Sequence, residues 1–351
     1  MIALCLALLC LGSPAIADSL RLATWNVELE RRGPGLLLRD ILREDDPQIT
    51  AIAAVIAALS PDILLLQEVD HDHDLHALRA LRDRLAQDGP HYPHILALRP
   101  NSGLYTGLDM DGDGRCCDAR DAQGYGAFTG QGGMALLSRL PIDHDGVHDF
   151  SDHLWRDLPG ALLPTHDDGT PFPSPKAQAV QRLSYTGQWV VPVMLPSGPL
   201  HLLAFHATPP VFDGPEDANG RRNHDEIRFW QVFLDGAFGP PPQARFVLMG
   251  DANLDPDDSD GRQGAIRALL ADPRLQDPRP MRPGPVAPTP DKSGDPRLHT
   301  VNWPDPGPGS LRVSYILPSR DLRILDAGIH WPEDSASASR HRLVWVDLTL
   351  P

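Results

Sequence analysis

Apolar runs alternate with amphipathic stretches along the chain, which is the pattern of an α/β protein. Strands are predicted at residues 20–25, 62–67, 200–205, 245–249, 311–317 and 341–350. Helices are predicted at residues 46–59, 75–85 and 223–234. Asp46 and Pro47 support the start of the first helix, because one residue can cap it and the other suits its first turn.

Two long segments rich in Pro and Gly interrupt this pattern, at residues 158–175 and 278–309. They are predicted to be loops, either ordered beside a site or flexible, and the sequence leaves both readings open. No internal repeat and no Gly/Ser linker divides the rest of the chain. We therefore expect one domain over residues 18–351.

The first 17 residues form a different kind of segment. Residues 2–11 are almost wholly apolar, and Gly12, Pro14 and the small-residue pattern at 15–17 follow. This order is typical of a signal peptide that is cleaved before Asp18, so we expect the protein to be exported to the periplasm or the medium. The alternatives are a buried N-terminal helix, which Gly12 and Pro14 disfavour, and a lipid anchor on Cys10.

Composition excludes several classes of protein. The 351 residues are 41% hydrophobic and 22% charged, so the chain can bury a core and is not a disordered protein. After residue 17 no apolar run approaches the roughly 20 residues that a membrane-spanning helix needs. The net charge of −16 argues against general affinity for polyanions, although a local basic or metal-bearing site stays open. The sequence indicates no protein partner.

Polar residues recur where the predicted strands end. They include an Asn, a Glu, an Asp with a nearby Asn, and two His, at Asn26, Glu68, His206, Asp251, Asn253 and His341. Each is a weak signal alone, but neighbouring strands bring their ends to one edge of a sheet. Together these groups supply oxygen ligands for a hard divalent cation, an orienter of water, and imidazoles for proton transfer. The pattern therefore favours a hydrolytic site for phosphate esters.

The ordered motifs TWNVE, LQEVD, FHATPP, LMGDANLD and SRH give this pattern a family resemblance. The chain resembles the endonuclease/exonuclease/phosphatase superfamily from residue 20 to residue 350, and FHATPP is most similar to its secreted DNase I branch. The resemblance implies a four-layer α/β sandwich, in which two packed mixed β-sheets are flanked by helices and the active site lies at one edge.

The resemblance also implies a role for each motif residue. Glu68 would be the main metal ligand and Asn26 a nearby ligand or phosphate contact. Asp251 and Asn253 would position the attacking water or the phosphate. His206 would protonate the leaving oxygen and His341 would contact phosphate or assist the nucleophile, although their acid and base roles stay open. Arg182, in QRLSYTGQW, would grip phosphate.

Two positions depart from the family pattern. Ser314 replaces the Asp that usually precedes Tyr315 and orients the closing histidine. Arg340 replaces a family Asp, which removes an acidic ligand and adds a cation able to hold phosphate. We therefore expect one Mg²⁺ or Mn²⁺ ion rather than two. A catalytically impaired phosphate- or metal-binding protein of the same fold is the alternative.

A second acidic motif, DMDGDG, begins at Asp109. Asp109, Asp111 and Asp113 have the spacing of the first ligands of a calcium-binding loop. The twelfth position is Arg120, so closure by Asp118 or Asp121 would be needed. The two readings are a structural Ca²⁺ site and a solvated turn. Cys116 and Cys117 follow, and we expect them not to pair, because a bridge between neighbours strains the peptide.

These observations predict an exported, metal-dependent phosphoric ester hydrolase that cleaves phosphodiesters by attack of water in line with the leaving oxygen. An extracellular nuclease acting on nucleic acid is the leading reading, and a phospholipid phosphodiesterase is the next.

Overall fold

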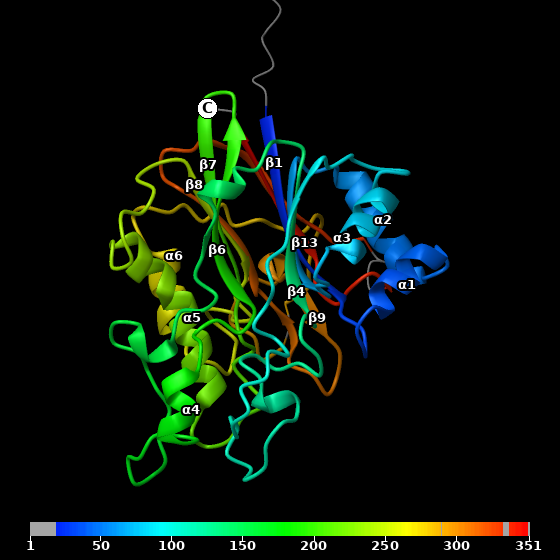
Figure 1. Cartoon of the computed structure of the whole chain (residues 1–351). Coiled ribbons are helices and arrows are strands. Elements are labelled where there is room, and N and C mark those ends of the chain that lie inside the picture. The colour runs from blue at the N-terminus through cyan, green and yellow to red at the C-terminus, as the bar shows by residue number, and fades with distance from the viewer. Residues whose placement is uncertain (1–18, 289, 333–336, 350–351) are drawn as a thin grey trace, which may run out of the picture.

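Two β-sheets pack face to face in the computed structural model, and helices cover their outer faces (Figure 1). The structure describes residues 19–288, 290–332 and 337–349. The four layers confirm the α/β sandwich predicted for the chain.

The first sheet has six strands, and its order is β12-β13-β1-β2-β4-β3. In chain order its strands are β1 (Ser19–Leu29), β2 (Ile63–Val69), β3 (His94–Leu96), β4 (Gly133–Ser138), β12 (Ile324–His330) and β13 (Leu343–Thr349). The sheet is mixed, because β1 runs parallel to β2 and antiparallel to β13.

The second sheet has five strands in the order β11-β8-β7-β6-β5. They are β5 (His148–Asp149), β6 (Gly187–Leu195), β7 (Gly198–His206), β8 (Phe246–Asp251) and β11 (Ser314–Pro318). This sheet is also mixed, because β7 and β8 are parallel and β11 is antiparallel to β8. A separate hairpin pairs β9 (Val301–Trp303) with β10 (Gly309–Leu311).

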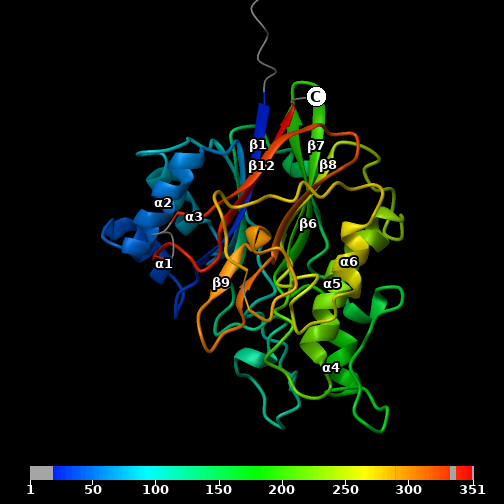
Figure 2. The same cartoon turned by 180° about the vertical axis from the view of Figure 1, so that it is seen from behind.

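The helices divide between the two outer faces (Figures 1 and 2). The first sheet is covered by α1 (Leu36–Arg43), α2 (Pro47–Leu59) and α3 (His76–Leu85). The second sheet is flanked by α4 (Pro175–Val180), α5 (Ala218–Leu234) and α6 (Gly264–Leu270). Among the described residues, no helix is long and apolar enough to cross a membrane.

Three apolar clusters follow from this layering. Leu22, Leu65, Leu202 and Met249 belong to the cluster between the sheets, where alternate residues of β1, β2, β7 and β8 face each other. A second cluster joins the first sheet to its helices, and a third joins the second sheet to α5 and α6. Side chains on both faces of the central strands are therefore buried, which explains their continuous apolar runs.

Where the local sequence signals were strongest, the predicted elements are present in the structure. Helix α2 begins at Pro47, and the Asp46 carboxylate accepts a hydrogen bond from the Ile49 amide at 3.0 Å. The predicted strand over residues 311–317 is wrong at its start, because Leu311 ends β10 and β11 begins at Ser314. The signal-peptide prediction lies outside the described residues.

Candidate active site

A connected set of polar side chains lies where β1, β2, β7 and β8 end. The Asn26 amide nitrogen, on β1, donates to Glu68 Oε1 at 3.0 Å and to Asp251 Oδ2 at 3.2 Å. Because Glu68 is on β2 and Asp251 is on β8, this amide joins the two sheets. The Asn26 and Asp251 side chains are fully buried and Glu68 is partly buried. The sequence prediction that these strand ends converge is confirmed by this geometry.

Irregular backbone turns the acidic residues toward this edge. Glu28 and Glu68 have φ values of 50° and 58°, and the pairing of β1 with β2 shifts register beside them. A β-bulge of this kind redirects one side chain at the end of a strand. Gly250, before Asp251, has φ 152°, and a Cβ there would lie 1.9 Å from the Phe205 carbonyl oxygen. Glycine is therefore required for the close approach of β7 and β8.

Glu68 carries the strongest electrostatic signal at the site. Burial raises the pKa of its carboxyl to about 8, and Glu30, Glu28 and Asp251 add to the rise while the Asn26 hydrogen bond opposes it. Three neighbouring carboxylates thus add negative charge around Glu68. A divalent cation would stabilise the ionised form, and an oxygen-rich donor set fits Mg²⁺ or Mn²⁺. The residues therefore fit the metal that the sequence predicted.

His206 lies at the end of β7 and contacts the same network through Asn253. Its Nε2 is 3.3 Å from the Asn253 amide nitrogen, and its Nδ1 is 3.3 Å from the Thr186 hydroxyl. A nitrogen that faces an amide donor must accept, so Nε2 is unprotonated in this arrangement. Burial lowers the pKa of His206 to about 4. The ring is therefore neutral near pH 7 in the free protein, and protonation must accompany any action as an acid.

His341 contacts Asp251 from the first sheet. Its Nδ1 lies 3.4 Å from Asp251 Oδ2, and the ring packs edge-on against Trp303 with centroids 5.3 Å apart. Burial lowers the pKa of His341, whereas Asp251 opposes that change. Ser314 is paired with Asp251 across β11 and β8, and its hydroxyl is buried with no hydrogen-bond partner among the described residues. Asp251 is thus the acid next to His341. The position at which the resemblance implies an Asp that orients this histidine is occupied by Ser314 in this chain.

Arg340 faces Glu28 rather than the network around Asp251. Its guanidinium forms an ion pair with Glu28, with Nε donating to Oε1 at 2.6 Å, and its backbone amide donates to Oε2 at 2.6 Å. Burial would raise the pKa of Glu28, but the Arg340 hydrogen bonds outweigh it and lower that pKa. The Arg340 side chain is 56% exposed, so part of the guanidinium still faces solvent.

Arg182 lies further from the network. Its guanidinium donates to Asn101 Oδ1 at 2.9 Å, and the Asn101 backbone amide donates to the Thr186 carbonyl. Because Thr186 contacts His206, Arg182 is connected to the site through two intervening residues. No direct contact between Arg182 and the catalytic candidates is present among the described residues.

Polar residues of α5 hold the loops that carry the site, which the sequence did not predict. The Asn223 amide donates to the Thr208 and Ala252 carbonyls at 2.7 Å each. Glu226 accepts from the backbone amides of Tyr185 at 2.6 Å and Thr208 at 2.7 Å. These bonds fix the segments that follow His206 and Asp251 and the one that precedes Thr186. These residues belong to the run RRNHDE, but the sequence alone does not show which of its side chains are buried.

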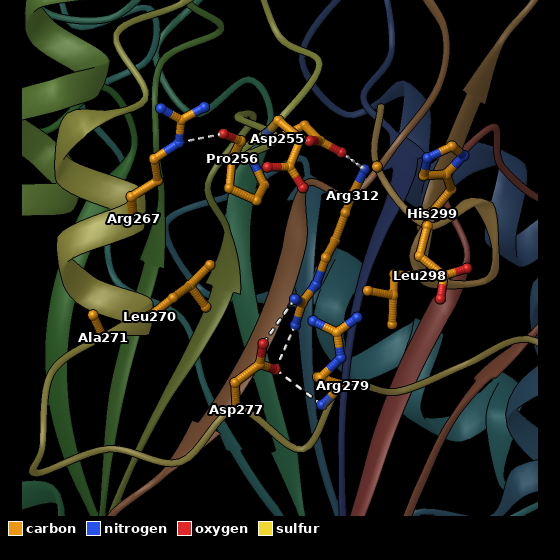
Figure 3. Close-up of a pocket in the computed structure, with 13 residues that line it drawn as sticks. Asp255, Pro256, Arg267, Leu270, Ala271, Asp277, Arg279, Leu298, His299 and Arg312 are labelled. Atoms are coloured by element: carbon orange, nitrogen blue, oxygen red, sulfur yellow. Dashed lines mark hydrogen bonds and ion pairs between the residues drawn. The ribbon is translucent and has the colours of Figure 1, made fainter. Parts of the chain in front are cut away.

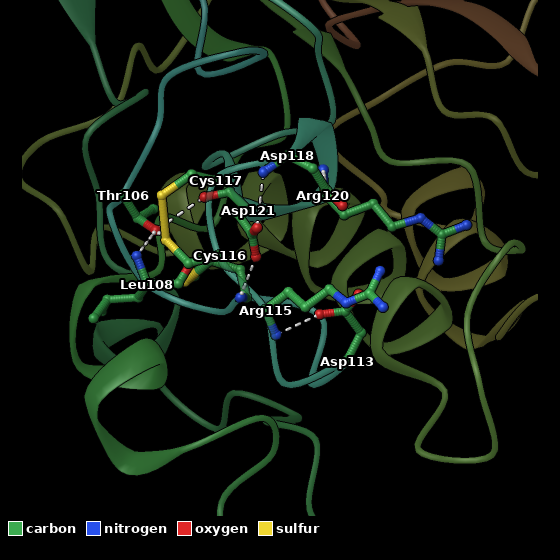
Figure 4. Close-up of a disulfide and its surroundings, with 10 residues drawn as sticks. Thr106, Leu108, Asp113, Arg115, Cys116, Cys117, Asp118, Arg120 and Asp121 are labelled. Carbon is green, nitrogen blue, oxygen red and sulfur yellow. Dashed lines mark hydrogen bonds between the residues drawn. A yellow bond between two sulfur atoms is a disulfide. The ribbon is translucent and has the colours of Figure 1, made fainter.

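The acidic loop lies apart from this network and differs from expectation in two ways (Figure 4). Carboxylate oxygens of Asp109, Asp111 and Asp121 lie within 4.8 Å of one another, whereas Asp113 is outside this group. The Asp113 carboxylate instead accepts from the Arg115 amide at 2.7 Å. Cys116 and Cys117 form a disulfide, so the expectation that these neighbours stay unpaired is wrong. Cys117 has a φ of 80°, so the peptide at the bridge is not extended.

Comparison with known proteins follows this geometry. The sequence profile of the Endonuclease/Exonuclease/phosphatase family matches residues 23–341. The chain belongs to this family. Its members hydrolyse phosphoric esters with the help of divalent metal ions. No curated protein matches the sequence.

Solved structures show the same fold at low sequence identity. An endonuclease/exonuclease/phosphatase from Beutenbergia cavernae is 20% identical, with TM-score 0.56 over 95% of this chain and 72% of the other. A family protein from Leptotrichia buccalis is 16% identical, with TM-score 0.52 over 94% and 99% of the two chains. Sphingomyelinase C from Streptomyces griseocarneus is 18% identical, with TM-score 0.51 over 94% and 99%. The similarity extends over nearly the whole chain.

Proposed function

We propose that this family member is a metal-dependent phosphodiesterase. The observation that carries the proposal is the hydrogen-bonded connection from Glu68 through Asn26 to Asp251, with a histidine beside Asp251 and another beside Asn253. Acidic, amide and imidazole groups thus belong to one network of contacts. Hydrolysis of a phosphoric ester needs this combination, because charge on phosphate must be neutralised while protons move.

Glu68 would hold the metal, with the Asn26 amide close enough to act as a second ligand after turning its oxygen inward. When bound, Mg²⁺ or Mn²⁺ would neutralise charge on a phosphate oxygen. One ion is expected, because the family acid at position 340 is an arginine in this chain. The proton held by Glu68, whose pKa is about 8, must leave before the carboxylate can act as a ligand.

Asp251 and Asn253 would hold the attacking water, because a carboxylate accepts its proton and an amide fixes its orientation. The Asn253 backbone amide donates to Asp251 Oδ1 at 2.9 Å, and the Asn253 side-chain amide donates to the Ala207 carbonyl at 2.9 Å, so both side chains are held in place. His206 would donate a proton to the leaving oxygen. A bound phosphodiester is anionic and would raise the pKa of His206 from about 4, which favours the protonated ring.

His341 and Arg340 would stabilise the charge that develops on the phosphate oxygens. His341 is next to Asp251, which favours its protonated form, and the exposed part of the Arg340 guanidinium can reach a ligand. Arg182 would act only at a distant part of the substrate, because Asn101 holds its guanidinium away from His206.

Nucleic acid is the substrate class we propose first, on the similarity of FHATPP to the secreted DNase I branch. Sphingomyelinase C among the similar folds keeps a phospholipid headgroup as the second candidate. A binding protein without turnover is the alternative from another class. The unpartnered Ser314 hydroxyl supports it, because the usual orienting acid is missing there.

An assay panel separates these candidates. The mature chain is stripped of metal and tested with Mg²⁺, Mn²⁺ or Ca²⁺ against DNA, RNA, sphingomyelin, a chromogenic phosphodiester and a phosphomonoester. We expect turnover of phosphodiesters with Mg²⁺ or Mn²⁺, and faster turnover of DNA or RNA than of sphingomyelin. Binding without turnover of any substrate would reject the enzyme in favour of the binding protein.

We also propose that the chain is exported, on the pattern of residues 1–17. Expression in a bacterial host should give a mature protein that begins at Asp18 and appears outside the cytoplasm. N-terminal sequencing checks this, and an uncleaved N-terminus on cytoplasmic protein would contradict it.

A further inference from the structure

A cleft of about 380 Å³ lies beside the segment that follows the Gly-Asp-x-Asn motif (Figure 3). Its lining includes Asp255, Asp277, His299 and Arg312. None of the catalytic candidates lines it among the described residues. The cleft is therefore a feature separate from the proposed active site.

Three groups have the chemistry of metal ligands, and two of them, Asp255 and His299, line this cleft. One ligand atom each from Asp255, Asp258 and His299 lies within 4.8 Å of the others. Asp255 and His299 are each 2% exposed, and Asp258 is partly exposed. In Figure 3 the labelled Asp255 and His299 lie at the same end of the cleft, above Asp277 and Arg279.

The two carboxylates are held by backbone amides and keep free acceptor capacity. Asp255 Oδ2 accepts from the Arg312 amide at 2.6 Å, and Asp258 Oδ2 accepts from the Gly294 amide at 2.9 Å. A carboxylate oxygen has two acceptor positions, so one remains on each of these atoms. Neither carboxylate forms an ion pair with a Lys or Arg in the described part of the chain. The Arg312 guanidinium binds Asp277 instead, at 2.6 and 2.8 Å.

His299 supplies an independent observation. Its Nε2 is buried and has no hydrogen-bond partner within the described residues. A buried polar atom without a partner is unfavourable, so such an atom calls for an explanation. A metal ion would accept the nitrogen lone pair and balance the charge of the two carboxylates at the same time.

We propose that Asp255, Asp258 and His299 bind one divalent transition-metal ion, with zinc preferred. One imidazole and two carboxylates match the ligands that zinc takes, whereas Ca²⁺ and Mg²⁺ favour oxygen donors alone. Asp255 and His299 both line the cleft, so the ion would be bound at its wall. This site is additional to the one at Glu68.

The ion would connect three segments that support the active site. Asp255 is two residues after Asn253, and its carboxylate also holds the Arg312 amide, two residues before Ser314. His299 precedes Thr300, whose hydroxyl accepts from the Val313 and Ser314 amides at 2.9 and 3.0 Å. The ion's role is therefore to fix these segments relative to one another.

Zinc titration of the mature chain carrying Glu68→Gln tests the proposal, because that background removes the active-site ligand. Isothermal titration calorimetry on metal-free protein should show one zinc site and weaker binding of Mg²⁺ and Ca²⁺. Adding His299→Gln or Asp258→Asn should each weaken zinc binding at least about tenfold, since even indirect partners of a metal ligand contribute 10–100-fold. Zinc should also raise the melting temperature of the parent, and much less that of the two variants.

A matched control is His73→Gln, which removes an exposed histidine next to Asp74 and should leave zinc affinity unchanged. Circular dichroism checks the fold of each variant, and the partly exposed Asp258 offers a test if His299→Gln fails to fold. Anomalous scattering from zinc-soaked crystals should place the ion between Asp255, Asp258 and His299. Absence of zinc binding, unchanged affinity in Asp258→Asn, or an ion at another position would each overturn the proposal.

Discussion

His341 Nδ1 lies 3.4 Å from Asp251 Oδ2, and this pair joins the ends of the two sheets. The Asp251 carboxylate also accepts from the Asn26 side chain and from the Asn253 backbone amide. Asp251 therefore contacts His341, Asn26 and Asn253, and each of these residues has its own proposed role. The position at which the resemblance implies an orienting acid for His341 holds Ser314, so we propose that His341 depends more heavily on Asp251 in this chain.

Asp251→Asn should abolish most of the activity, because it removes the acid beside His341 and the acceptor for water together. We expect turnover to fall roughly 10³-fold to 10⁴-fold, as when the acid partner of a catalytic histidine is lost. Steady-state kinetics on a phosphodiester measure the effect, and circular dichroism checks folding. A loss of tenfold or less would mean that Asp251 is not central.

Ser314→Asp should raise turnover by restoring an acid to the family position. The new carboxylate would lie across from Asp251 in the β11–β8 pair, so it would favour protonated His341 and also repel Asp251. We therefore expect a higher kcat, little change in KM, and a loss of stability of several kcal/mol, because the new carboxylate is fully buried at this position. Kinetics and urea unfolding test both effects.

Ser314→Ala is the matched control and should leave turnover nearly unchanged, because the serine hydroxyl has no hydrogen-bond partner among the described residues. A fall in kcat for Ser314→Asp, with Ser314→Ala unaffected, would mean that the added charge disturbs the site.

Arg340→Ala tests whether this guanidinium contacts phosphate. The partly exposed ion pair with Glu28 contributes about 1 kcal/mol or less to stability, so the fold should persist. We expect KM to rise while kcat changes little, and Arg340→Lys to recover part of the loss. Unchanged KM in Arg340→Ala would restrict this residue to its contact with Glu28.

The raised pKa of Glu68 predicts how metal-free stability depends on pH. The folded protein keeps the Glu68 proton up to about pH 8, whereas the unfolded chain releases it near 4.5, so the native state binds more protons between these values. Stability therefore falls as pH rises through this window. The free energy of unfolding in EDTA should drop more for wild type than for Glu68→Gln between pH 5 and pH 8, and Mg²⁺ should reverse the drop. Parallel curves for the two proteins would contradict the assigned pKa.

Asn223→Ala tests the support from α5. It leaves the buried Thr208 and Ala252 carbonyls without a donor, which should cost about 1–3 kcal/mol of unfolding free energy. Turnover should fall at temperatures where the protein is fully folded, because the segments after His206 and Asp251 lose a common anchor. Urea unfolding measures the first effect and kinetics the second. Full activity in a destabilised variant would limit Asn223 to folding.

The strand ends that form the site could be predicted because polar residues directly follow apolar runs in the sequence. Glu68 and Asp251 each end a run of buried residues, and the parallel arrangement of their strands with β1 and β7 brings them to one edge. Asn26, at the same edge, then lies close enough to bond both acids. The family motifs contained this order, so the fold and the site could be expected from the amino-acid sequence.

Contacts between distant loops were not predictable in the same way. Thr186, Asn223 and Glu226 are separated in sequence from the residues they hold, and polar side chains in a helix usually face solvent. The ion pair of Arg340 with Glu28 depends on the irregular backbone at Glu28, and no periodic pattern indicates it. The paired cysteines likewise depend on the conformation of one loop rather than on their spacing.

Whether the protein hydrolyses phosphodiesters with a metal ion held by Glu68 can be measured directly. Metal-free mature protein is assayed on a chromogenic phosphodiester while Mg²⁺ or Mn²⁺ is added back, for wild type and Glu68→Gln in parallel. We expect turnover to appear with added metal in wild type and to stay at background in Glu68→Gln. Turnover that persists in EDTA, or equal metal-dependent rates in the two proteins, would contradict it.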